Sequence, residues 1–118
     1  MADGKTVIWL GSSLKDLRAM SEGVQDVIGF ALDRVQRGKP HPGIKPLQGL
    51  SGVQEIRADV DTDTYRAVYT VNLGDVIYML HVFQKKSKRG AETPKPDMDL
   101  IRARLKKAQE DANERRRD

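Results

Sequence analysis

The chain has 118 residues, 38% hydrophobic and 32% charged, which is enough for one modest hydrophobic core. It contains no cysteine and only two histidines, so disulfides, thiolate metal sites and a cysteine nucleophile are excluded and a histidine-based metal cluster is not expected. No apolar run approaches the roughly 20 residues that a membrane span requires, and the N-terminus lacks a signal pattern. We therefore expect a cytoplasmic protein that uses no metal or cofactor.

The positive charge is concentrated in the last third of the chain. Residues 85–118 hold 12 Lys/Arg and 7 Asp/Glu, a net charge of +5, whereas the first 84 residues hold 9 and 10, a net charge of −1. This asymmetry indicates an anionic partner, either a nucleic acid or an acidic protein. The alternative interpretation is a solvated helix that happens to be basic.

The first half of the chain predicts one strand, a helical pair and a loop. Lys5–Leu10 is a short β-branched and aromatic run typical of a strand. Apolar residues then recur at helical spacing from Leu14 to Val35, with an interruption near Ser21–Gly23 and an end at Gly38. Lys39–Gly52 holds three prolines and three glycines and is predicted to be a loop that packs against the body of the protein.

The second half predicts three strands and a helix. Val53–Val60, Thr64–Val71 and Val76–Phe83 are separated by turn residues and form an antiparallel meander whose last strand, apolar on both faces, is central. Thr93-Pro94 begins a helix with one apolar stripe, and residues from about 110 to 118 form a frayed polar tail. The predicted fold is α+β and a single domain: an N-terminal strand and helical pair packed on a small, mostly antiparallel sheet, with a C-terminal helix.

The strongest candidate for chemistry is a pair of arginines on neighbouring strands. If the first hairpin turns symmetrically about Asp61–Thr62, paired residue numbers sum to 123 and Arg57 lies opposite Arg66. Like charges facing each other cost on the order of 0.2–1 kcal/mol, so they need a counter-charge. Glu55 or Asp59 could supply it structurally. The functional alternative is a phosphate that draws both guanidinium groups together, in which case Arg66→Ala should remove activity and leave the fold intact.

Several segments together resemble a known family. They are KPLQGL, the E-I-R and Y-R-x-x-Y strands, LHVFQKK and the TPK segment that follows it. From about Val7 to Ala108 the chain resembles the phage-derived, HigB-like branch of the RelE/ParE toxin superfamily. The resemblance implies a RelE-like fold and the toxin half of a type II toxin–antitoxin pair. It further implies a ribosome-dependent endoribonuclease that cuts mRNA without a metal, and a cognate antitoxin, usually a helix-turn-helix DNA-binding protein.

The resemblance also implies where the substrate binds. Such toxins carry basic residues at alternate positions of a meander strand, where this chain has Glu55 and Arg57, and an arginine at the position of Arg66. Arg57 and Arg66 are then expected to stabilise the phosphate charge, while Glu55 acts as a base or orients Arg57. Some relatives have a tyrosine or histidine near the scissile phosphate beyond the basic cluster, and this chain has neither after His81.

The remaining candidates are basic. Lys85 or Lys86, with a pKa lowered by neighbouring cations, is expected to transfer protons. The expected RNA-binding residues are Lys88, Arg89 and Lys45. The basic run Lys85, Lys86, Lys88 and Arg89 follows a buried strand, so we expect its charged ends to stay exposed.

Two alternatives stay open from the sequence. His81 shares its alternating face with Ile77, Met79 and Phe83, so we expect a buried, hydrogen-bonded core residue instead of a catalyst. The chain as a whole is predicted to be an mRNA-cleaving toxin, with a ParE-like gyrase inhibitor or a non-catalytic nucleic-acid- or protein-binding module of phage origin as the alternatives.

Overall fold

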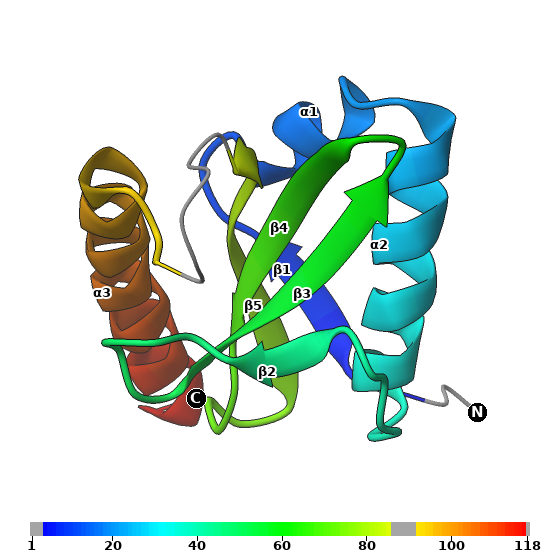
Figure 1. Ribbon diagram of the computed structural model, residues 1–118. Coiled ribbons are helices and arrows are strands. Elements are labelled where there is room, and N and C mark those ends of the chain that lie inside the picture. Colours follow the sequence, from blue (N-terminus) through cyan, green and yellow to red (C-terminus); the bar gives the residue numbers. More distant parts are fainter. Residues whose placement is uncertain (1–3, 86–91, 118) are drawn as a thin grey trace.

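A computed structural model describes residues 4–85 and 92–117 (Figure 1). The elements in chain order are β1 (Thr6–Trp9), α1 (Ser13–Arg18), α2 (Glu22–Gln36), β2 (Ile44–Pro46), β3 (Val53–Val60), β4 (Asp63–Thr70), β5 (Val76–Lys85) and α3 (Lys95–Arg117). Within these described residues, five strands form one sheet in the order β1-β5-β4-β3-β2. β1 pairs with β5 in parallel, and the other neighbours are antiparallel.

This architecture confirms the predicted α+β class and the meander. The break between the first two helices lies where it was predicted, because the side chain of Ser21 accepts a hydrogen bond from the backbone N–H of Val24 and starts α2. The predicted loop 39–52 is different, since Ile44–Pro46 adds a short edge strand to β3. Proline is tolerated there because an edge strand leaves one side without ladder hydrogen bonds.

The sheet separates two hydrophobic clusters. On one face, α1 and α2 pack on residues such as Ile56, Tyr69 and Met79. On the other face, α3 covers a second cluster that includes Val68 and Leu80. In Figure 1 the sheet accordingly lies between α2 on the right and α3 on the left. β5 is buried on both faces, as its apolar pattern predicted.

A β-bulge changes the direction of side chains in β5. Val68 pairs with His81 and Tyr69 pairs with Met79, so Leu80 is the extra residue. His81 therefore lies on the α3 side with Leu80 and Phe83, and the prediction that it shares a face with Ile77 and Met79 is wrong. The prediction assumed that side chains alternate between the two faces along all of β5, and the apolar pattern gives no sign of the extra residue at Leu80.

Polar contacts hold α3 along much of its length. Arg104 donates to the carbonyl oxygen of Leu80 at 2.8 Å, and its guanidinium lies against Gly11, where a Cβ atom would be 2.6 Å from the guanidinium carbon. Near the end of the helix, the hydroxyl of Tyr78 donates to Asp111 at 2.5 Å, and Arg115 donates to the same oxygen at 2.8 Å. These contacts explain why the structure has helix as far as Arg117, where the sequence predicted a frayed tail from about residue 110.

None of the helices in the described part of the chain has both the length and the hydrophobicity needed to cross a bilayer.

Candidate functional site

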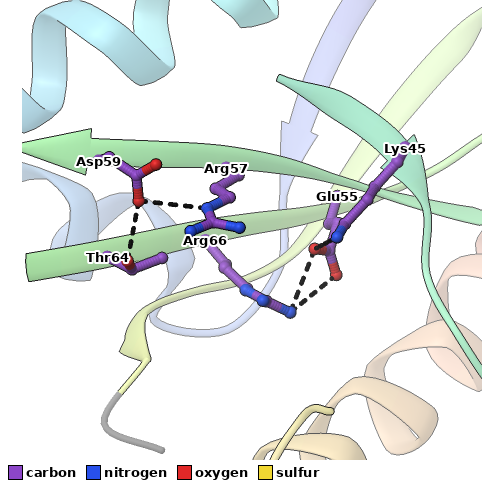
Figure 2. A network of polar contacts seen from close by, with 6 residues as sticks. All are labelled: Lys45, Glu55, Arg57, Asp59, Thr64 and Arg66. Carbon is purple, nitrogen blue, oxygen red and sulfur yellow. Dashed lines mark hydrogen bonds and ion pairs between the residues drawn. The ribbon is translucent and has the colours of Figure 1, made fainter. Parts of the chain in front are cut away.

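The candidate site is a charged area of the sheet on the face that carries α3. Five charged residues project from this face: Lys45 on β2, Glu55 and Arg57 on β3, Arg66 on β4 and Lys85 on β5. Directly paired residues of neighbouring strands share a face of the sheet, and so do residues two positions apart on one strand. We call these five residues the charged cluster. Figure 2 shows four of them together with the two polar side chains next to Arg57.

The register confirms the arginine pair. Arg57 lies directly opposite Arg66, as the symmetry of the hairpin predicted. Their environments differ strongly, since the side chain of Arg57 is 47% exposed and that of Arg66 is 1% exposed. Arg57 is therefore accessible to a ligand from solvent, whereas Arg66 is enclosed by the protein.

Each arginine has its own carboxylate (Figure 2). Arg66 Nη1 lies 3.1 and 3.2 Å from the two carboxylate oxygens of Glu55, and both side chains are buried. Arg57 Nε lies 3.2 Å from Asp59 Oδ1. The hydroxyl of Thr64 donates to the same oxygen at 2.8 Å, and this hydrogen bond, with the Arg57 guanidinium, holds the pKa of Asp59 below its usual value.

These contacts bear on two expectations from the sequence. The counter-charges that a structural interpretation requires are present, and both carboxylates named from the sequence, Glu55 and Asp59, supply them. Glu55, however, does not orient Arg57, because it pairs with Arg66 and lies 4.0 Å from the ammonium of Lys45. Arg57 pairs instead with the exposed carboxylate of Asp59, two residues away on β3.

Lys85 ends β5 beside this pair. It lies opposite Thr64, one diagonal step from Arg66, and is 8% exposed. Burial lowers the pKa of Lys85, and the charge of Arg66 lowers it further, while the carboxylate of Glu55 opposes the shift. The expectation that the basic run keeps its charged ends in solvent is therefore wrong for Lys85, although the lowered pKa agrees with the prediction.

The cluster has a positive surplus, with four cations against the carboxylate of Glu55, and the neighbouring carboxylate of Asp59 reduces this surplus to a net charge of +2. An exposed guanidinium on the same sheet face as a buried lysine of lowered pKa is suited to bind a phosphate and to exchange a proton near it. Among the described residues, no group of three or more His, Asp or Glu side chains is placed to hold a metal ion.

Three of the predicted residues cannot be placed. Lys86, Lys88 and Arg89 lie outside the described residues, so their predicted contacts with RNA stay predictions. Lys45 is 45% exposed at the edge of the charged cluster.

Two contacts of this face were missed from the sequence. Thr64 fixes Asp59, and the hairpin arithmetic that paired the arginines would also have paired these two residues. The other contact joins His81 Nε2 to Asp97 on the first turn of α3 at 2.7 Å. His81 is thus buried and hydrogen-bonded, as predicted, and its ring stacks on Phe83 with centroids 4.6 Å apart.

Comparison with known proteins places the chain in a family. Residues 15–106 match the family described as "Phage derived protein Gp49-like (DUF891)". Among solved structures, a mutant of the Escherichia coli toxin RelE in the free state has a TM-score of 0.56 at 12% identity, over 88% of this chain and 97% of that chain. The RelBE2 toxin–antitoxin complex from Mycobacterium tuberculosis gives 0.51 at 24% identity, over 69% and 98%.

No curated protein gives a significant match. The two structural likenesses establish the RelE fold, in agreement with the fold implied by the sequence resemblance. The family model covers residues 15–106 of the 118, well over half of the chain. The chain therefore belongs to the phage-derived Gp49-like family and has the fold of the RelE toxins.

Proposed function

We propose that the protein is the toxin of a type II toxin–antitoxin pair and inhibits translation as a ribosome-dependent mRNA endoribonuclease. Its family, its RelE fold and the toxin–antitoxin complex among its structural neighbours support a toxin that is held by an antitoxin. The single observation that carries the cleavage activity is the exposed Arg57, directly opposite Arg66, on the same face of the sheet as Lys85, whose pKa is lowered.

The proposed reaction uses the RNA itself as nucleophile. A base removes the proton of a 2′-hydroxyl, the O2′–P bond forms, the P–O5′ bond breaks, and a proton is delivered to the leaving O5′. The products are a 2′,3′-cyclic phosphate and a 5′-hydroxyl end. Negative charge increases on the phosphate oxygens in the transition state, so fixed cations beside them lower the barrier.

Arg57 is assigned to the phosphate. Its guanidinium is half-exposed and holds Asp59 through Nε, a contact that fixes the side chain and leaves Nη1 and Nη2 for a phosphate. Arg66 is assigned a positioning role, because it is buried against Glu55 and acts on Lys85 through its charge. Glu55 is assigned to Arg66, since a carboxylate that is buried and ion-paired is poorly placed to act as a base.

Lys85 is assigned to proton transfer. Only a neutral amine can accept the 2′-hydroxyl proton, and a lowered pKa increases the neutral fraction near neutral pH. Cleavage is then expected to increase with pH up to the pKa of Lys85, which lies below its usual value. Lys86 is the candidate donor to O5′, and Lys88, Arg89 and Lys45 are assigned to the RNA backbone.

A second function has support from one observation. Because both arginines already have carboxylate partners, the cluster also suits a protein that binds nucleic acid or protein without cleaving anything. A ParE-like gyrase inhibitor equally needs no phosphate-cleaving site. The three candidate functions predict different effects on translation, on mRNA and on gyrase.

The experiment adds purified protein to a reconstituted translation reaction and, separately, to DNA gyrase with supercoiled plasmid. Our proposal predicts that translation stops and that mRNA is cut, with gyrase unaffected. Trapped gyrase–DNA complexes with intact mRNA would establish the gyrase inhibitor, and no effect on either would favour the binding module. The same assays are run with Arg57→Ala and with Arg37→Ala as its matched control. Like Arg57, Arg37 is half-exposed and pairs with a nearby carboxylate, which in its case lies on α2.

A further inference from the structure

A recess lies on the opposite face of the sheet from the charged cluster. It has a volume of about 580 Å³ and is bounded by the C-terminal end of α2, the start of β1 and residues 38–41. We call it the α2 pocket. In Figure 1 this is the region at the lower end of α2, where β1 begins beside the helix. Nothing in the proposed cleavage reaction uses it.

The α2 pocket has an apolar floor and a cationic rim. Val35, Ile44 and Ile77 contribute aliphatic side chains to it, while Lys5 and Lys39 are the cationic residues that line it. Among the described residues that line the pocket there is no Asp or Glu. The charge of the two lysines is therefore not balanced within the lining, and a ligand that combines negative charge with an apolar group would complement both features.

The backbone of the rim is held in place. The N–H of Lys5 donates to the carbonyl of Gln36 at 2.9 Å, and the side chain of Gln36 donates back to the carbonyl of Lys5 at 2.8 Å. The N–H of Lys39 donates to the carbonyl of Arg34 at 2.8 Å. Both lysines thus project from an ordered backbone, which reduces the entropy lost when a ligand binds.

An exposed aromatic ring extends this surface. Phe30 on α2 is 60% exposed and is one of only two large hydrophobic side chains exposed in the described part of the chain. It contacts the ring of His41 edge-on, with centroids 5.8 Å apart, and His41 lines the pocket. An aromatic side chain beside a rimmed recess is typical of an anchor point in a protein–protein contact.

We propose that the α2 pocket binds an acidic peptide segment of a partner protein, with one apolar side chain on the aliphatic floor and carboxylates near Lys5 and Lys39. A peptide fits better than RNA, because the aliphatic floor complements an apolar side chain, and Tyr69, an aromatic residue in the lining, is buried and donates its hydroxyl to Gln54 at 2.9 Å. The site is separate from the charged cluster, so this inference does not rest on the proposed cleavage activity.

The test selects ligands from a random twelve-residue peptide library displayed on phage, using the whole protein as bait. We expect the enriched peptides to combine Asp or Glu with an apolar residue. Their affinities, measured by fluorescence polarisation, should decrease at least about tenfold in the Lys5→Glu/Lys39→Glu double variant, because each carboxylate then meets a like charge.

Matched variants make the result specific. Lys15→Glu reverses an exposed lysine on α1, beyond the other end of α2, and should leave peptide affinity within about twofold of wild type. Phe30→Ala should weaken binding without changing its charge dependence. The proposal is overturned if no peptides are enriched, if the enriched peptides lack acidic residues, or if the double variant binds them as wild type does. It is also overturned if a single-stranded RNA oligonucleotide, and no peptide, depends on Lys5 and Lys39.

Discussion

The buried pair between Arg66 and Glu55 makes a quantitative prediction about stability. Arg66→Met removes the guanidinium and leaves a carboxylate whose side chain is 2% exposed, with the half-exposed Lys45 4.0 Å away. Breaking one side of a buried ion pair costs about 3–5 kcal/mol, since the remaining charge has lost its close partner and is not solvated in exchange. For a chain of this size, this cost lowers the melting temperature by roughly 10–20 °C.

A double variant separates the effect of charge from that of packing. Arg66→Met/Glu55→Gln removes both charges and keeps similar volumes, so it should recover at least about 2 kcal/mol relative to Arg66→Met alone. The free energy of unfolding is measured by urea titration with the fluorescence of Trp9, the single tryptophan, as the signal.

Two results would refute this reasoning. Arg66→Met could be as stable as wild type, or the double variant could be as unstable as the single one. The first result would restore the expectation from the sequence that Arg66 can be removed with the fold intact. The burial of Arg66 against Glu55 argues against that expectation.

Three further predictions concern other parts of the α3 face and the basic run. His81→Gln should lower the melting temperature more than cleavage per folded molecule, since its hydrogen bond to α3 is structural; a stable but inactive variant would make His81 catalytic. Burial and the hydrogen bond to Asp111 raise the pKa of Tyr78 to about 12. Its contribution to stability is therefore complete below pH about 10 and disappears between pH about 10 and 12, so the stability difference between wild type and Tyr78→Phe should decrease only in that range. Neutralising Lys88 and Arg89 should reduce the salt slope of ribosome binding, measured by pelleting, by about 0.7–0.9 for each phosphate that is no longer neutralised, and an unchanged slope would exclude a role for these residues in binding RNA.

Local patterns in the sequence were sufficient for the three-stranded meander and for the arginine pair. The hairpin turns through Asp61, whose φ of 58° lies in the left-handed region, and this tight, symmetric turn fixes Arg57 opposite Arg66. Ser21 has the chemistry of an N-cap, so the break between the two helices was equally visible.

Features that depend on distant segments could not be predicted. Arg57 and Arg66 are directly paired across neighbouring strands, so the strand pattern does not distinguish them. Only the packing of the whole chain buries Arg66 and leaves Arg57 exposed. The bulge at Leu80 inverts the faces of β5 without any irregularity in the apolar pattern. Lys85 begins a basic run whose composition predicts exposure to solvent, although the side chain of Lys85 itself is buried at the end of β5.

The central claim is that the charged cluster cuts mRNA, and it is tested most directly by primer extension on a defined mRNA translated by purified ribosomes. We predict new 5′ ends with wild type, and with the control variant Arg37→Ala. Lys85→Arg keeps the charge, but a guanidinium stays protonated and cannot accept the 2′-hydroxyl proton, so this variant should cut at least about 100-fold more slowly. Arg57→Ala should be similarly impaired. An mRNA that stays intact with wild-type protein at a concentration equal to that of the ribosomes, or cuts that Lys85→Arg makes as fast as wild type, would contradict the account.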